Sequence, residues 1–395
     1  MSNSLLTPTQ VTRKALMILH QKLNFIGNIN RQYDDSFAQS GAKIGDTLKI
    51  RLPNQYTVRT GKTMSAQDTT ESSVTLTMAT QKGVDLNFTS VELALSIDDF
   101  AARILEPAMA TLAANIEADA FNMSLDVYNA VNNVSAAINF KQLLLAQKRM
   151  IDMLTPQDNN RSLILNTQDN VDMVDGLKGL FQDSSAIARQ YREGLLGITA
   201  GFGAVYQNTI MPTQTTGTDA SNCTVNGASQ TGASVTIANG SAKTFKKGDV
   251  VTLAGCNRVH PETKSDTGEL QQFVVTADVA AGGTSLPISP SIVTSGAAQN
   301  VSASPTNSGA VTKVGGAAAI YKPSLAFHRD AFTFVSADLP MPKAAQFASR
   351  QVYDGISMRI WQGDDIINDA FPARIDVLYG FKSIRPQMAC RILSN

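Results

Sequence analysis

The feature that most constrains the fold of this chain is a change of composition that begins after residue 212 and reverses near residue 319. Residues 213–318 consist mainly of Ser, Thr, Gly, Ala, Asn and Val, and their only aromatic residues are Phe245 and Phe273. Short Val/Thr runs alternate there with turn sequences such as KKGD and AAGG, which is typical of a small all-β barrel or sandwich rather than of a disordered linker. Because the earlier type of sequence resumes at 319, we interpret 213–318 as a domain inserted into a host fold.

The host sequence contains one long helical pattern between Ser96 and Val131. Ser96 with Asp99 resembles a capping box at a helix start, and apolar residues then recur at steps of three and four. Pro107 cannot donate a backbone hydrogen bond, so it should break the pattern or occupy the first turn of a second helix that runs to about Tyr128. The apolar stripe predicts core positions that include Leu112, Ile116 and Met123.

Shorter helical patterns lie on either side of the long one. Thr7-Pro8 opens a pattern with apolar residues at Val11, Ala15, Ile18, Leu19 and Leu23. A short helix on a loose arm cannot bury this stripe alone, so we expect it to pack on the body of the protein or on a neighbour. A second helix is predicted over about 140–154, with Leu143, Leu144, Gln147, Met150, Ile151 and Leu154 on its inner side. A buried strand at 162–165, a helix at 171–177 and further helix and strand patterns up to 208 follow, which indicates a compact α+β domain.

Residues 44–90 change to the period of two that is typical of strands. The alternating apolar residues are Leu48, Ile50 and Leu52, then Val74, Leu76 and Met78, and finally Val84, Leu86 and Phe88. A polar, Gly/Ser/Thr-rich stretch separates the first two groups, so we interpret 44–90 as a long β-hairpin with a mobile tip. Its exposed face carries Lys49, Arg51, Arg59 and Lys62 before the turn and Asp68 and Glu71 after it. These charges are either an ordinary solvated surface or an arm that lies on a neighbouring subunit.

A search for catalytic or ligand-binding motifs is almost entirely negative. His20, His260 and His328 lie in three separate segments, and the sequence contains no CxxC, GxSxG or Walker motif. The glycines at 194, 197, 201 and 203 do not have GxGxxG spacing, and Gly363-Asp364-Asp365 is better explained as a turn than as a metal site. Glu117 and Asp119 are two residues apart in a helix and so face different directions, which places them on its polar side. We therefore expect no catalytic site, no cofactor and no metal.

Charge and cysteine content narrow the protein class further. Lys and Arg balance Asp and Glu at 33 each, and charged residues make up 17% of the chain, so no basic face for nucleic acid is indicated. No stretch resembles a secretion signal or approaches 18 uncharged apolar residues, so neither export nor membrane insertion is supported. The three cysteines, Cys223, Cys256 and Cys390, are far apart and odd in number, which favours buried thiols in a reducing cytoplasm over disulfides.

The order of these parts, together with several local stretches, resembles the major capsid proteins of tailed bacteriophages, specifically podovirus-type coat proteins with an inserted β-domain. The matching stretches are GDTLKIRLP at 45–53, ILEPAMATLAANIEADAF at 104–121, KKGDVVTLAG at 246–255 and DVLYGFKSIRP at 376–386. The resemblance implies an α+β capsid fold with an N-terminal arm, an extended loop, a peripheral domain with a spine helix, an axial domain and an inserted barrel-like domain. The implied boundaries are 1–43 for the arm, 44–90 for the extended loop, 91–136 for the peripheral domain, 137–212 for the axial domain, 213–318 for the insert, and 319–395 for strands that complete the axial and peripheral domains.

The resemblance also implies a function in assembly rather than catalysis. Many copies would form hexamers and pentamers of an icosahedral head around packaged double-stranded DNA, with scaffolding and portal proteins as further partners and no membrane. Residence in the virion would follow assembly in the host cytoplasm. The contacts between copies would involve Arg51, Arg59, Lys62, Asp68 and Glu71. One alternative is a non-viral shell protein of the same fold. Two others are less consistent with the sequence: an exported adhesin with a β-domain would need an export signal, and an enzyme would need a group of polar residues that converge in a pocket, and neither feature is found.

Overall fold

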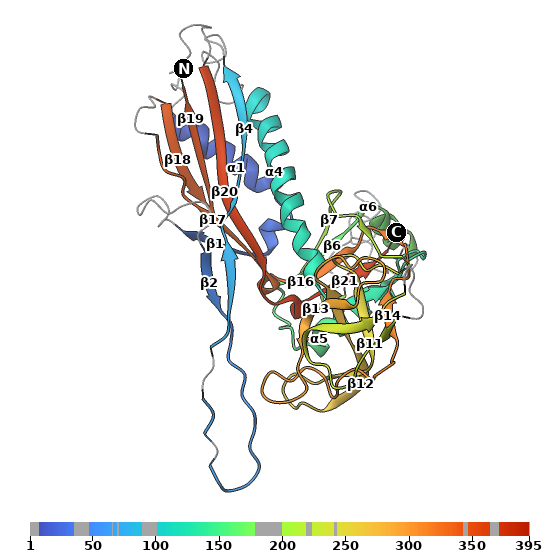
Figure 1. The fold of residues 1–395 in the computed structure, drawn as a ribbon. Coiled ribbons are helices and arrows are strands. Elements are labelled where there is room, and N and C mark those ends of the chain that lie inside the picture. Colours follow the sequence, from blue (N-terminus) through green and yellow to red (C-terminus); the bar gives the residue numbers. More distant parts are fainter. Residues whose placement is uncertain are drawn as a thin grey trace. The chain divides into compact units, whose positions relative to one another are not determined.

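The structure is a computed structural model that describes residues 8–34, 47–64, 66–68, 71–88, 101–177, 200–218, 223–240, 243–342, 347–363 and 371–394. The chain forms two compact units, each built from separate stretches of sequence (Figure 1). The first unit comprises 1–51, 73–120 and 332–384, and the second comprises 52–72, 121–331 and 385–395. Both contain helices and sheets, so the predicted α+β class is confirmed.

The first unit is built on a six-stranded sheet with the order β1-β17-β20-β19-β18, in which β4 also pairs with β20. β1 runs parallel to β17, and the other pairs are antiparallel. The strands are β1 (Asn30–Asp34), β4 (Thr80–Phe88), β17 (Phe332–Ala337), β18 (Phe347–Tyr353), β19 (Ile356–Gln362) and β20 (Phe371–Ser383). β1 lies in a polar stretch without an alternating pattern, and for this reason the sequence did not predict it as a strand.

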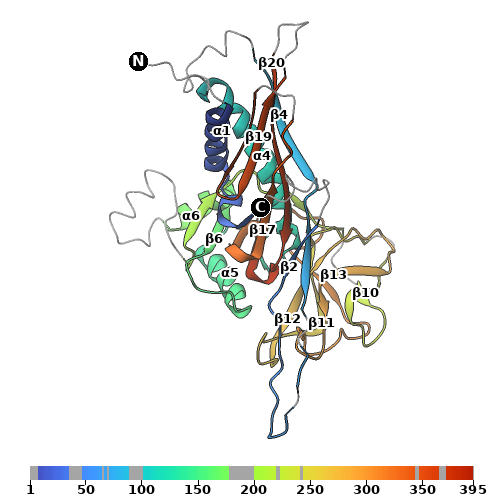
Figure 2. The same cartoon turned by 90° about the vertical axis from the view of Figure 1, so that its left-hand side faces the viewer.

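The N-terminal helix packs on its own unit. α1 (Pro8–Lys22) contacts β18 and β19 and lies beside β19 in Figure 2. The short helix η1 (Ile26–Asn28) follows α1. The buried side of α1 is formed by Val11, Ala15, Leu16 and Leu19, and the buried Leu23 follows directly after the helix. The apolar stripe of this helix therefore packs on the body of the protein, which is one of the two surfaces expected to cover it.

The long helix is shorter than predicted. A π-helical turn η3 (Ala101–Leu105) leads into α4 (Glu106–Phe121), and Pro107 occupies its first turn as expected. The chain then tightens into the 3₁₀ turn η4 (Asn122–Asp126) and becomes extended at Val127, so the expected end near Tyr128 is wrong. Asn122 and Ser124 compete for backbone hydrogen bonds and disfavour the helix there. Ser96, Asp99 and the first predicted stripe residues lie outside the described residues.

The carboxylates of α4 correct a second expectation. Glu117 is 2% exposed and accepts a hydrogen bond from the Phe25 backbone N–H, so it does not lie on a solvated side of the helix. Asp119 binds Lys82 of β4 at 2.7 Å and accepts a hydrogen bond from the Tyr379 hydroxyl of β20 at 2.6 Å. Both acids thus attach α4 to neighbouring elements of the first unit.

The predicted hairpin is present but ends earlier than expected. β2 (Thr47–Arg51) pairs antiparallel with β3 (Ser73–Thr77), whereas the third alternating run forms β4 in the large sheet. Residues 44–46 lie outside the described residues. The base of the hairpin is anchored by an apolar cluster of Leu76, Met78, Val335, Ala337, Leu339 and Leu378, against which Leu48 and Ile50 pack.

The second unit contains a five-stranded sheet with the order β5-β21-β16-β6-β7. The strands are β5 (Ala130–Asn132), β6 (Arg161–Leu165), β7 (Ala204–Gln207), β16 (Ser324–His328) and β21 (Ala389–Leu393), and the helices are α5 (Phe140–Asp152) and α6 (Thr167–Leu177). Short turns η5 (Arg329–Ala331) and η6 (Pro386–Met388) complete this part. We refer to it as the host sheet.

The inner side of α5 differs from the prediction. Leu143, Ala146 and Met150 are buried in the core of the host sheet, but Leu144, Ile151 and Leu154 are 43%, 38% and 41% exposed. The sequence contains more apolar positions than one helix face can bury, and their spacing alone does not show which are covered.

The segment predicted as an inserted all-β domain forms a six-stranded sheet with the order β14-β11-β12-β13-β10-β9. Its strands are β9 (Thr224–Val225), β10 (Gly232–Ala238), β11 (Val250–Val259), β12 (Asp266–Val275), β13 (Ser285–Ile292) and β14 (Val311–Val314). The Val225 N–H donates to Gly309 O and the Val311 N–H donates to Cys223 O, so the two edge strands also join and close a barrel. Phe245 and Phe273 lie in its apolar core. The barrel alternative to a sandwich is therefore correct.

A short two-stranded ribbon connects the barrel to the host sheet. The entering strand β8 (Gln214–Thr215) pairs antiparallel with the leaving strand β15 (Ile320–Tyr321). The buried carboxylate of Asp249 accepts hydrogen bonds from the backbone N–H groups of Gly217 and Lys246, at 3.0 and 2.9 Å. The buried ammonium of Lys313 donates to Thr218 O and Thr244 O, so both ends of the insertion are fixed by buried polar groups.

Candidate assembly surfaces

The described residues contain no arrangement typical of an active site. No group of three or more His, Cys, Asp or Glu side chains among them could hold a metal ion. A hollow of about 320 Å³ on the first unit is lined by Gln81, Gly83, Asp85, Arg374 and Asp376. Its charges are already engaged, because Arg374 binds Asp85 at 2.8 Å and Asp376 binds Arg359 at 2.6 Å. The hollow is therefore a paired polar surface of a sheet rather than a set of catalytic groups.

The charged residues singled out in the sequence lie on or beside the loop between β2 and β3, residues 52–72. Arg51 is the last residue of β2, and the five predicted contact residues are all exposed. The Arg59 guanidinium donates a hydrogen bond to the carbonyl of Gly61. The structure thus places Arg59, Lys62, Asp68 and Glu71 on one exposed loop, with Arg51 directly before it.

The same loop exposes apolar side chains that the sequence interpretation did not single out. Val58 is 94% exposed, Met64 is 80% exposed and Tyr56 is 57% exposed. Isolated exposed apolar residues are common, but several at the end of one loop indicate a contact surface. The available sequence signal was the presence of Val58 and Met64 within an otherwise polar segment.

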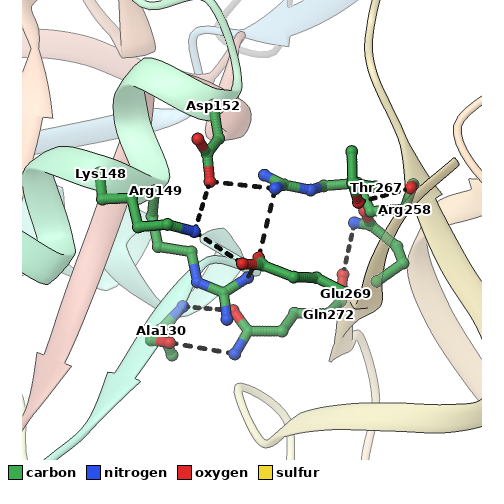
Figure 3. A network of polar contacts seen from close by, with 9 residues as sticks. Ala130, Lys148, Arg149, Asp152, Arg258, Thr267, Glu269 and Gln272 are labelled. Atoms are coloured by element: carbon green, nitrogen blue, oxygen red, sulfur yellow. Dashed lines mark hydrogen bonds and ion pairs between the residues drawn. The ribbon is translucent and has the colours of Figure 1, made fainter. Parts of the chain in front are cut away.

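A junction network of five charged side chains joins the barrel to the host sheet within the second unit (Figure 3). It consists of Lys148, Arg149 and Asp152 of α5, Arg258 of β11 and Glu269 of β12. Arg258 Nη2 donates to Asp152 Oδ2 at 3.0 Å and to Glu269 Oε2 at 3.3 Å. Lys148 Nζ donates to the same two carboxylates, at 3.0 Å to Asp152 and 2.7 Å to Glu269.

The electrostatics of this junction network follow from its geometry. The hydrogen bond from Lys148 lowers the pKa of Glu269 below its usual value, although partial burial opposes this. Burial raises the pKa of Asp152, but the hydrogen bonds from Lys148 and Arg258 outweigh it, so the net direction is downward. Both carboxylates are thus held in the charged form. Three cations face two carboxylates. Arg258 is 6% exposed, and its buried Nε and Nη1 have no hydrogen-bond partner among the described residues.

Neutral contacts lie beside the junction network. The Gln272 side chain of β12 acts like a neighbouring strand toward β5, because its Oε1 accepts from Ala130 N at 2.8 Å and its Nε2 donates to Ala130 O at 3.0 Å (Figure 3). Arg391 of β21, fully buried, donates to Gly248 O at 2.8 Å. Val250 of the barrel packs with Ala130, Tyr321 and Leu393. The barrel therefore covers the β5 edge of the host sheet.

The remaining chemistry-bearing residues are structural in the described part of the chain. Cys223, Cys256 and Cys390 are buried free thiols, as expected. His328 is buried and lies 3.1 Å from Asp158, while His260 Nδ1 accepts backbone N–H groups within its own turn. Gly201 and Gly203 lie in the turn before β7, whereas Gly194, Gly197, Asp364 and Asp365 lie outside the described residues. No described helix is long and apolar enough to cross a membrane.

Comparison with known families identifies the class of protein. The family model described as "P22 coat protein - gene protein 5" matches residues 26–393, which is nearly the whole chain. The chain belongs to this coat protein family. It is a major capsid protein of the tailed-phage type, the subunit of an icosahedral head, and its place is the virion capsid. Because this family is structural, the match supports the capsid assignment over the adhesin and enzyme alternatives.

Solved structures similar to this coat protein include the one named "Mycobacterium phage Che8", with 13% identity, coverage of 94% of this chain and 90% of that chain, and a TM-score of 0.46. "Asymmetric unit of bacteriophage PhiM1 mature capsid" has 10% identity, coverage of 94% and 87%, and a TM-score of 0.43. "CUS-3 coat protein I-domain" is 32% identical over 24% of this chain and 96% of that chain, with a TM-score of 0.19. No curated protein matches the chain significantly.

Proposed function

We propose that this coat protein assembles through loop 52–72, which leaves its own subunit and binds an adjacent copy in hexamers and pentamers of the head. The observation that carries the proposal is the exposure of this loop on an anchored base. Leu76 and Met78 are 0% and 1% exposed at the base, while Val58 and Met64 at the far end are 94% and 80% exposed. A fixed base with an uncovered end is the arrangement expected of a surface that is completed by another copy.

The charges on the loop contribute to the choice of partner. Arg51, Arg59 and Lys62 would meet acidic side chains of the adjacent copy, and Asp68 and Glu71 would meet cations. Exposed ion pairs contribute little affinity, typically about 0.2–1 kcal/mol each, so they serve mainly to orient the partners. Near-zero net charge, with 33 cations and 33 acids, keeps repulsion between many packed copies low.

A charge reversal tests this assignment. Glu in place of Arg51, Arg59 and Lys62 should reduce the yield of closed shells in negative-stain microscopy and sedimentation, while the fluorescence of Trp361 in β19 should report an intact first unit. The control variant carries Glu in place of Arg13, Lys141 and Lys382, which are exposed cations outside the loop, so the change in net charge is the same. Equal shell yields from the two variants would show that Arg51, Arg59 and Lys62 do not contribute to assembly.

The remaining roles follow the capsid resemblance. We infer an arm at 1–43, an extended loop at 44–90, a peripheral domain at 91–136, an axial domain at 137–212, an insert at 213–318 and returning strands at 319–395. Assembly would take place in the host cytoplasm with scaffolding and portal proteins, and the shell would enclose double-stranded DNA without sequence-specific contact or catalysis. The division of the structure into two units and the barrel closed by β9 and residues 309–311 support this organisation.

A further inference from the structure

One side chain closes the end of loop 52–72. Gln67 Oε1 accepts hydrogen bonds from the backbone N–H of Thr57 at 2.9 Å and from its hydroxyl at 3.0 Å. Gln67 Nε2 donates to the Thr57 carbonyl at 2.6 Å. Both ends of the amide are thus used on one residue of the opposite branch, as a paired strand would use its own N–H and C=O. We call residues 57–67 the tip segment.

The tip segment has further internal order although it is exposed. The Arg59 guanidinium donates to the Gly61 carbonyl, and Gly61 has a φ of +106°, a conformation that residues with a side chain rarely adopt. Toward the base, the Leu52 N–H donates to Ser72 O at 2.8 Å and joins the two branches again. Hydrogen bonds among its described residues therefore join the two branches of the tip segment, and the mobility expected from its composition stays a prediction.

We propose that Gln67 is a positioning residue that holds Val58 and Met64 in place for insertion into the surface of a second copy of this chain. The inference rests on the proposed function of loop 52–72 and adds to it that apolar side chains, rather than the charges, supply the affinity. A second copy is the partner because a coat protein acts as many identical subunits and because Val58 and Met64 are left in water in the single chain, at 94% and 80% exposed.

Preorganisation gives Gln67 its effect. A flexible loop loses conformational freedom when it binds, and each immobilised side chain or backbone segment weakens association. A loop that is already closed loses less. Removing the Gln67 hydrogen bonds should therefore weaken each loop contact roughly tenfold, which is the scale of about 1.4 kcal/mol, although neither contacting side chain changes.

Three variants of the full-length protein separate these roles. Gln67→Ala removes the three hydrogen bonds, and Gln55→Ala is the matched control because Gln55 is an exposed glutamine of the same loop. Val58→Thr combined with Met64→Gln keeps the approximate side-chain shapes but makes them polar. The measurements are the critical concentration for shell formation by light scattering and backbone hydrogen exchange over residues 57–67 in the unassembled protein.

We expect Gln67→Ala to raise the critical concentration roughly tenfold and to accelerate hydrogen exchange in the tip segment. The Val58/Met64 variant should raise the critical concentration without faster exchange, and Gln55→Ala should change neither. Faster exchange with unchanged assembly in Gln67→Ala would overturn the positioning role. Unchanged assembly in the Val58/Met64 variant would overturn the apolar contact. If the charge reversal of Arg51, Arg59 and Lys62 still reduced the shell yield, the proposed function of the loop would stand although the apolar contact had failed.

Discussion

The junction network should couple Arg258 and Asp152 energetically, and a double-mutant cycle can measure this coupling. Arg258→Met keeps the apolar stem and removes the charge, and Asp152→Asn keeps the shape and removes the negative charge. Two unit charges 4 Å apart interact by about 4 kcal/mol at the effective dielectric constant of a protein surface. Asp152 is 25% exposed, so solvent screens its charge, and it also forms an ion pair with Lys148. Both effects should reduce the coupling between Arg258 and Asp152 to about 1–2 kcal/mol.

The single substitutions should differ in a way that the structure explains. Asp152→Asn leaves Arg258 with Glu269 as its ionic partner, whose side chain is 40% exposed. Arg258→Met loses two hydrogen bonds but also removes the buried Nε and Nη1, which have no partner in the described part of the chain. Burying an unsatisfied N–H costs about 1–3 kcal/mol, so Arg258→Met should destabilise the junction less than loss of a buried arginine usually does.

The assay must report on the second unit alone, because a two-unit chain need not unfold in one step. Cys256 lies in β11 and Cys390 in β21, and both thiols are buried, so their labelling rates in low urea report opening of the barrel and of the host sheet. Trp361, the only tryptophan, lies in β19 and reports the first unit as an internal control.

The expected result is that each single variant increases thiol labelling and that the double variant increases it by less than the product of the two effects. The coupling should shrink when the salt concentration is raised from 0.05 to 0.5 M, because ions screen partly exposed charges. Strictly multiplicative effects, meaning a coupling below about 0.3 kcal/mol, would refute the electrostatic account of the junction. A parallel shift of the Trp361 signal would show that the substitutions act on the whole fold instead.

Three further results are expected. Leu112 is 2% exposed on α4, so Leu112→Asp should prevent soluble assembly through a loss of about 3–5 kcal/mol or more, while Thr111→Asp on the exposed side of the same helix should assemble; urea unfolding followed by Trp361 fluorescence compares them. Hydrogen bonds from Asn160, and then from His328, lower the pKa of Asp158 to about 2, so its stabilising contribution is present above about pH 4 and is lost as the pH falls toward 2; Asp158→Asn should flatten the dependence of unfolding on pH in that window. Burial raises the pKa of both Cys256 and Cys390 to about 12, so iodoacetamide at pH 8 should label neither in the folded protein, and rapid labelling without denaturant would contradict their placement.

The sequence predicted the elements whose signals are local. The alternation of Leu48 and Ile50 and the composition of the insert correspond to β2 and the barrel, because side-chain period and turn residues act over a few positions. The end of α4 was predicted too late, because the apolar stripe continues to Val127 although the backbone turns at Asn122. Leu144 and Ile151 were assigned to the inner side of α5, since periodicity shows an apolar face but not what covers it.

The contacts between distant parts of the sequence could not be predicted for a different reason. Arg258 and Asp152 are 106 positions apart, and Gln272 reaches a backbone 142 positions away, so no local pattern connects them. The sequence predicted Glu117 on the polar side of the helix, but the residue accepts a hydrogen bond from the Phe25 N–H, which lies 92 positions away. Gln67 and Thr57 are ten positions apart in a polar loop that contains many equivalent side chains, and their pairing depends on the backbone course of the turn.

The insertion of the barrel between β7 and β16 also determines the order in which the chain can fold during translation. β9 to β14 form one contiguous stretch of sequence, so all barrel strands have been synthesised before β16, the strand between β6 and β21, leaves the ribosome. β6 and β7 can pair with each other early, but β5 must wait for β21, and during that interval β5 has an open edge that could pair with another nascent chain. A barrel that folds first would place Gln272 where it can occupy that edge, protecting the unfinished host sheet from neighbouring copies on the same polysome.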